Sequence, residues 1–176
     1  MPASTTPVLA GALALATLLA GAGGASAGCF RSCVSERINS ADSDLAMRNA
    51  MRECRDGCAA EETASLKAEG LYDAYVACKP KPLSDEEFKR LRGENHSFSV
   101  QSNVLSWEFS NRLPDKVIRM VEIGTQTMNL SDAYFTTRTI VPPGHATTIV
   151  VMDFFDGYPT VRYASKITRI EACPVK

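Results

Sequence analysis

The chain has 176 residues, with 19 Lys and Arg, 20 Asp and Glu, and a formal net charge of −1 at pH 7. The charges are spread evenly, because residues 28–92 carry 11 basic and 12 acidic side chains and residues 93–176 carry 8 of each. This balance excludes a basic nucleic-acid-binding surface and an acidic tail, and it favours other proteins as partners.

An apolar segment opens the chain. Residues 1–27 contain no charged side chain, and an apolar run over residues 8–20 precedes the small residues Ala25, Ser26 and Ala27. This pattern predicts a secretory signal peptide over residues 1–27, so we expect the protein to be periplasmic or secreted. The run is shorter than the roughly 20 residues that a membrane span needs, so no transmembrane segment is expected after its removal.

Cleavage after Ala27 would place Cys29 second in the mature chain, where a lipid could be attached. Lipoprotein signals normally carry Leu three residues before that cysteine, and Ser26 stands there. Lipidation would also leave one of the six cysteines unpaired, whereas an even number in an exported chain favours three disulfides. We therefore favour three disulfides over a lipid anchor.

Four cysteines form two C-x3-C pairs, Cys29 with Cys33 and Cys54 with Cys58. Residues four apart lie on one face of a helix, so two antiparallel helices would join Cys29 to Cys58 and Cys33 to Cys54. Residues 39–44 are rich in turn and N-cap types, which predicts the turn between these helices. The sequence therefore predicts a helical hairpin stapled by two disulfides.

The spacing of these cysteines resembles the twin C-x3-C helical hairpins of mitochondrial intermembrane-space proteins, over residues 29–58 only. This resemblance implies a shape and no activity. Four thiolates are also a zinc-binding set, so a metal-handling protein is an alternative. The chain has no C-x-x-C motif, which is the usual spacing in thiol oxidoreductases and in zinc sites.

The second helix is expected to start near Asp44 and to continue past residue 70, with an interruption at Gly57 or Gly70. Tyr72 and Tyr75 follow at helical spacing. They would either pack on the rest of the protein or lie exposed as a docking surface, and the sequence does not separate these alternatives.

Two prolines, Pro80 and Pro82, end the helical pattern. Ser84 followed three residues later by Glu87 is a capping box, which predicts a short helix from residue 85 to about residue 92, closed by Gly93. We place the end of the N-terminal helical module, residues 28–93, at this point.

Short alternating or apolar runs separated by turn residues follow. They cover residues 98–101, 105–109, 116–123, 134–141, 146–155 and 160–172. This rhythm predicts an antiparallel β-sandwich over residues 94–176 and resembles immunoglobulin-like and fibronectin-like domains. Trp107 shares a face of its run with Leu105 and Phe109, and we expect this face in the core. The predicted fold class is therefore α+β.

The two remaining cysteines, Cys78 and Cys173, stand at the ends of the two predicted modules. A disulfide between them would tie the modules together. Closing so long a loop would stabilise the fold by roughly 4 kcal/mol in the chain-entropy treatment. The sequence does not determine this connectivity, because six cysteines allow many pairings.

The aromatic and acidic segment at residues 153–158 has two interpretations. As an exposed tip, Phe154, Phe155 and Tyr158 would anchor a partner, because aromatic side chains supply much of the binding energy of interfaces. In the simpler interpretation, one phenylalanine alternates into the core and the Asp-Gly pair at 156–157 forms the turn between the last two strands. The Asp-Gly signal favours the second interpretation.

Motifs for hydrolysis, nucleotide binding and calcium binding are absent from the sequence. Its two histidines, His96 and His145, stand beside turn residues. An envelope enzyme built around His145 with Asp153 or Asp156 is a further alternative. No cofactor is predicted.

Together these features predict an exported, non-enzymatic structural or interaction protein, a subunit or adaptor that binds other proteins of the envelope or extracellular space. A secreted inhibitor-like binder would share the same chemistry and differ only in its partner. The sequence predicts no particular oligomeric state.

Overall fold

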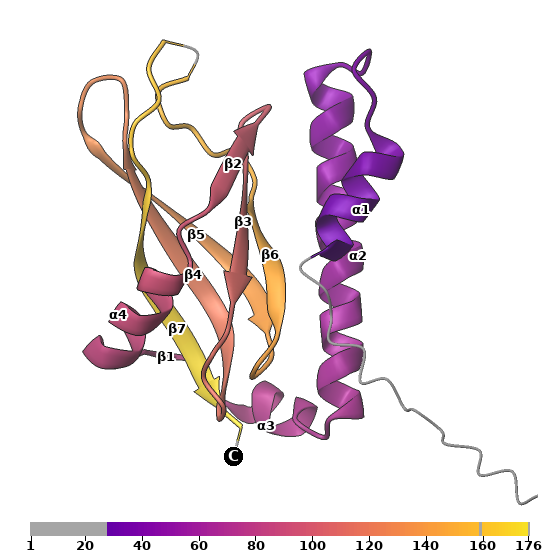
Figure 1. Cartoon of the computed structure of the whole chain (residues 1–176), viewed down its shortest axis with the longest axis vertical. Helices are drawn as coiled ribbons and strands as arrows, with labels where there is room; N and C mark the ends of the chain where they lie inside the picture. Colours follow the sequence, from indigo (N-terminus) through magenta and orange to yellow (C-terminus); the bar gives the residue numbers. More distant parts are fainter. Residues whose placement is uncertain (1–27, 159, 176) are drawn as a thin grey trace, which may run out of the picture.

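A computed structural model describes residues 28–158 and 160–175 of the chain (Figure 1). The predicted signal peptide, residues 1–27, lies outside the described residues. The fold is α+β, as predicted, with four helices and two antiparallel sheets in the described part. The helices are α1 (Gly28–Arg37), α2 (Asp44–Ala68), α3 (Tyr72–Ala77) and α4 (Asp85–Glu94). The strands are β1 (Lys81–Pro82), β2 (Phe98–Gln101), β3 (Val104–Ser110), β4 (Lys116–Gln126), β5 (Asp132–Val141), β6 (Ala146–Val151) and β7 (Lys166–Pro174).

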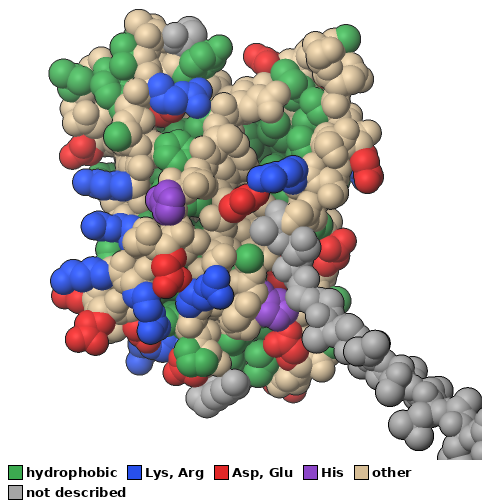
Figure 2. Space-filling view, viewed as in Figure 1, with side chains coloured by type: hydrophobic (Ala, Val, Ile, Leu, Met, Phe, Trp, Pro, Cys, Tyr) green, Lys and Arg blue, Asp and Glu red, His purple; other side chains and the backbone are tan. Residues whose placement is uncertain are grey.

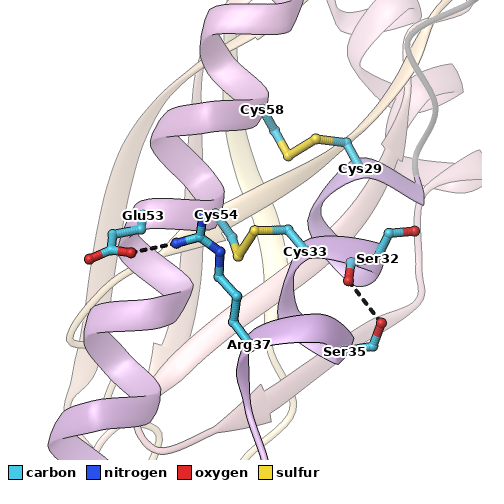
Figure 3. Close-up of a disulfide and its surroundings, with 8 residues drawn as sticks. All are labelled: Cys29, Ser32, Cys33, Ser35, Arg37, Glu53, Cys54 and Cys58. Atoms are coloured by element: carbon cyan, nitrogen blue, oxygen red, sulfur yellow. Dashed lines mark hydrogen bonds and ion pairs between the residues drawn. A yellow bond between two sulfur atoms is a disulfide. The ribbon is translucent and has the colours of Figure 1, made fainter.

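Helices α1 and α2 run antiparallel and are joined by two disulfides; we refer to them as the helical pair. Cys29 is bonded to Cys58 and Cys33 to Cys54, with Cα atoms 6.0 Å and 5.6 Å apart (Figure 3). Ser43 caps α2, because its hydroxyl accepts a hydrogen bond from the amide three residues later. The cap explains why α2 begins at the end of the turn-rich segment.

Helix α2 continues without a break through Gly57, which is one of the two positions at which the sequence predicted an interruption. It ends near Gly70, which adopts φ +71° and so occupies the left-handed region that glycine accepts without strain. A glycine costs about 1 kcal/mol in a helix interior relative to alanine. Packing of α2 against α1 and the sheets offsets this cost at Gly57.

The two sheets have the strand orders β1-β7-β4-β5 and β2-β3-β6, and they share one core. Leu105, Trp107 and Phe109, the predicted core face, are at most 3% exposed. The ring of Trp107 stacks on Phe98, with centroids 4.9 Å apart. Ile123, Val141, Ile149, Ile167 and Ile170 complete the facing layers. Alternation along each strand therefore directs one set of side chains between the sheets.

Helix α4 packs with the sheets, although the predicted division of the chain at residue 93 groups it with the helical module. Leu91 is fully buried in the core between the sheets. The capping box of Ser84 and Glu87 is present, as predicted, whereas Gly93 lies inside the helix and Asn95 caps its end. The Asn95 carboxamide accepts a hydrogen bond from the Ser110 amide at 2.6 Å, which fixes α4 to the end of β3.

The helical pair lies against the outer face of the β2-β3-β6 sheet (Figure 1). Phe30 and Met51 pack there against Val104 and Val150. At the other end of α2, Leu66 packs against Val117 of β4 and Val175. The third disulfide joins Cys78, just after α3, to Cys173 of β7, with Cα atoms 5.8 Å apart. Two apolar contacts and one covalent bond thus fix the helices to the sheets.

The predicted hairpin between the last two strands is wrong. Strand β6 ends at Val151 and β7 begins at Lys166, and the connection over residues 152–165 crosses from one sheet to the other. A two-residue Asp-Gly turn joins only neighbouring strands of one sheet, so it cannot form here. Asp156 instead organises the connection: its carboxylate is 1% exposed and lies 3.3 Å from Nε of Arg162.

Candidate functional site

Exposed hydrophobic side chains gather at the end of the sheets where the β4–β5 loop and the β6–β7 connection lie (Figures 1 and 2). We call the following set, each member of which is between 41% and 66% exposed, the loop-end surface: Met128, Leu130, Tyr134, Phe155, Tyr158 and Val161. Isolated exposed apolar residues are ordinary on protein surfaces, whereas a cluster on adjacent loops is typical of a binding site.

The loop-end surface contains two of the predicted partner-binding residues, Phe155 and Tyr158. The third residue of that segment, Phe154, is fully buried, so its assignment to an exposed tip is wrong. Its ring meets Phe135 with centroids 4.7 Å apart, and its amide donates to the Asn103 carbonyl at 2.7 Å. Phe154 therefore anchors the connection from inside while its neighbour points outward.

Tyr72 and Tyr75 are half-buried and pack around Leu66 and Val117 at the end of α2. The Arg119 guanidinium lies 4.1 Å from the centroid of the Tyr75 ring and donates to the Tyr75 carbonyl at 3.0 Å. The sequence left open whether these tyrosines pack on the rest of the protein or form an exposed docking surface, and in the structure they pack.

The acids proposed as catalytic partners of His145 lie far from it. His145 lies just before β6, and its Nε2 is 3.2 Å from Oε1 of Glu69. Asp153 pairs with Arg48 just beyond the other end of β6, and Asp156 lies further along the connection. Six extended residues span about 20 Å, so the structure does not bring together the residues of the alternative enzyme site around His145.

All six cysteines are in disulfides. A disulfide sulfur is not a thiolate ligand, so the two C-x3-C pairs would have to be reduced before they could bind zinc. Within residues 28–158 and 160–175, no group of three or more His, Cys, Asp or Glu side chains is placed to hold a metal ion. The cysteines therefore act in this structure as covalent links.

A groove of about 640 Å³ lies between α2, β4, β5 and β6; we call it the arginine groove because Arg55, Arg119 and Arg138 line it. Glu62 of α2 also lines it and is 3% exposed. Burial raises the pKa of Glu62 from 4.5 to about 7, a hydrogen bond to Thr147 opposes this, and nearby glutamates add to the rise.

Sequence reasoning missed the arginine groove. Arg55, Arg119 and Arg138 are spread over more than eighty positions and carry no local motif, and only the packing of α2 beside β4 and β5 brings them to one groove. Glu62 gave one weak signal, because it continues the buried stripe of α2 formed by Met51, Cys54, Cys58 and Leu66. An acid on the apolar stripe of an amphipathic helix is unusual.

A smaller groove of about 320 Å³ lies between α1 and the outer face of β2 and β3. Phe30, Val34 and Val104 contribute apolar side chains to it, and Arg31 pairs with Glu108 across it. The arginine groove has about twice this volume and is the larger of the two.

No described helix combines the length and apolarity needed to cross a membrane. No protein family, curated protein or solved structure matches the chain. A functional assignment therefore depends on the surfaces of this chain itself.

Proposed function

We propose that this chain is an exported, non-enzymatic interaction protein, in which a disulfide-stapled helical hairpin supports an immunoglobulin-like sandwich. Its loop-end surface binds another protein of the envelope or extracellular space. The observation that carries the proposal is the clustering of exposed aromatic and aliphatic side chains on two loops and the start of β5, at one end of the sheets. Loops at the ends of such sandwiches commonly bind partners, because the sheets hold them rigidly.

The chemistry of the loop-end surface suits a protein partner. Tyr158 lies under the Arg162 guanidinium, 5.5 Å from ring centroid to Cζ, so an aromatic ring and a cation are presented together. Tyrosine and arginine are enriched among the residues that dominate binding energy in protein interfaces. Phe155 adds an apolar side chain, 41% exposed, on the same connection.

The loops that carry this surface are held from below. The buried Phe154 and the Asp156–Arg162 ion pair fix the β6–β7 connection. The Ser165 hydroxyl donates a hydrogen bond to the Thr125 hydroxyl at 3.1 Å, beside the start of β7 and the end of β4. A preorganised surface loses less conformational freedom on binding, which favours specific association.

Three disulfides are typical of exported proteins, since the cytosol keeps thiols reduced. The mass of the natively exported protein tests this part of the proposal. We expect a mature chain beginning at Gly28, lighter by six hydrogens than the reduced chain. A retained leader or free thiols would contradict export as proposed.

Site-specific crosslinking tests the binding surface. A photo-crosslinking amino acid at position 155 is expected to capture a discrete protein in the native compartment, and the Tyr158→Ser variant is expected to reduce that capture. The matched control places the crosslinker at position 76, because Val76 is 58% exposed but lies in α3, at the opposite end of the molecule from the two loops (Figure 1). Equal capture from both positions would refute a dedicated loop-end site, and capture only from a host extract would favour the inhibitor-like binder.

A further inference from the structure

The arginine groove presents guanidinium groups that lack acidic partners. Arg138 of β5 stands opposite Met120 in the β4–β5 register, and Arg119 and Arg138 both line the groove. In the described part of the chain, neither Arg119 nor Arg138 forms an ion pair. Arg55, by contrast, lies 2.8 Å from Asp56. The side of the groove formed by β4 and β5 is thus positively charged.

The acidic side chains of the groove do not neutralise this charge. Glu171 of β7 lines the groove but pairs with Arg169. Glu62 is 3% exposed, and its Oε2 has no hydrogen-bond partner. Because its pKa is raised to about 7, Glu62 is largely uncharged at mildly acidic pH.

The orphaned oxygen of Glu62 is a second and independent sign of a ligand. A buried polar atom without a hydrogen-bond partner is unfavourable, and native proteins usually satisfy such atoms. Glu62 lines a groove whose volume of about 640 Å³ lies within the usual range for small-molecule sites. A bound ligand can therefore supply the missing hydrogen bond.

We propose that the arginine groove binds a hydroxylated organic carboxylate of the sugar-acid class, with the ligand carboxylate at Arg119 and Arg138 and a ligand hydroxyl at Oε2 of Glu62. A guanidinium binds a carboxylate through two parallel hydrogen bonds. A hydroxyl both donates and accepts, so it suits Glu62 in either protonation state. An amine at the same place would be repelled by the neighbouring arginines. Thr136 and Thr139 add hydroxyl groups to the wall.

Binding of D-glucuronate to the full mature protein, followed by calorimetry and by amide chemical shifts, tests this inference. We expect saturable binding that shifts amides of β4 and β5, with no comparable binding of D-glucose, which lacks the carboxylate. The Arg138→Ala variant should weaken binding at least about tenfold, and Arg138→Lys should weaken it less, because lysine keeps the charge but not the two-pronged geometry. Arg90→Ala, which removes an exposed arginine of α4, is the charge-matched control and should bind normally.

The inference would be overturned by no saturable binding of D-glucuronate, by equal binding of D-glucose, or by equal binding of D-glucuronate to Arg138→Ala and Arg90→Ala. Inorganic phosphate binding as tightly as D-glucuronate would replace the sugar-acid class with a general anion site and so would also overturn it. Arg138 is exposed, and the thermal unfolding of each variant verifies that it folds. The test does not depend on the loop-end surface, so this inference and the proposed function can fail separately.

Discussion

Replacing Glu62 by glutamine should remove a large part of the pH dependence of stability. The pKa of Glu62 is raised from 4.5 to about 7, mainly because the side chain is buried. One pKa unit corresponds to about 1.4 kcal/mol, so the ionised form is disfavoured in the fold by about 3 kcal/mol. The raised pKa means that the folded state holds this proton more tightly than the unfolded state. Stability from this group is therefore complete below pH 4.5 and is lost as the pH rises towards 7.

Glu62→Gln keeps the shape and stays neutral at every pH. At pH 8 we expect the variant to be more stable than the natural protein by about 2–3 kcal/mol, which is roughly 4–12 °C in Tm for a chain of this size. At pH 4 the two should be nearly equal. Denaturant unfolding with the disulfides intact, at several pH values between 4 and 8, measures the difference.

Glu61→Gln is the matched control, since Glu61 is the exposed neighbour on the same helix. It should change stability by less than about 0.5 kcal/mol at every pH. A Glu62→Gln variant that is less stable at pH 8, or whose advantage is the same at pH 4 and pH 8, would refute the burial argument. Glu62 would then be solvated in solution.

Three further changes test other parts of the fold. Replacing both Cys78 and Cys173 by serine should destabilise the protein by about 4–5 kcal/mol, measured by denaturant unfolding, while a normal stability would show that the bond constrains nothing. Phe154→Ala should cost about 3–5 kcal/mol and Phe155→Ala less than about 1 kcal/mol; similar losses in Tm would contradict the opposite orientations of the two rings. The Lys116 ammonium forms an ion pair with the Glu87 carboxylate and donates a hydrogen bond to it. This hydrogen bond lowers the pKa of Glu87 below 4.5, so the carboxylate stabilises the fold above about pH 4.5 and less as the pH falls. Glu87→Gln should cost about 1 kcal/mol at pH 7 and little at pH 3, and a constant cost would argue against the ion pair.

Features set by local chemistry were predictable from the sequence. Ser84 and Glu87 form a capping box because their spacing alone brings the hydroxyl and carboxylate to the first turn of a helix. The core face around Trp107 follows from strand alternation. Spacing also suggested joining Cys29 to Cys58 and Cys33 to Cys54, and these bonds are present in the structure.

Features set by tertiary contacts were not predictable. The Asp-Gly pair at 156–157 carries a hairpin signal, but the flanking strands lie in different sheets, and strand order is not written in any local run. The burial of Asp156 beside Arg162 and of Glu62 beside Thr147 depends on segments that meet only in the folded chain. The arginine groove was missed for the same reason.

Strand β7 is the last strand of the described residues, yet it lies inside its sheet, between β1 and β4. The disulfides of the helical pair join residues 29 and 21 positions apart, whereas Cys78 and Cys173 are 95 positions apart. As the chain is made from its N-terminus, the helical pair can form its disulfides while the β1-β7-β4-β5 sheet still lacks one of its two inner strands. Cys78 can form its native bond only after β7 has been added, because Cys173 lies on that strand. The order in which the free thiols are lost during folding therefore shows when β7 joins its sheet, and we expect Cys78 and Cys173 to be the last pair to react.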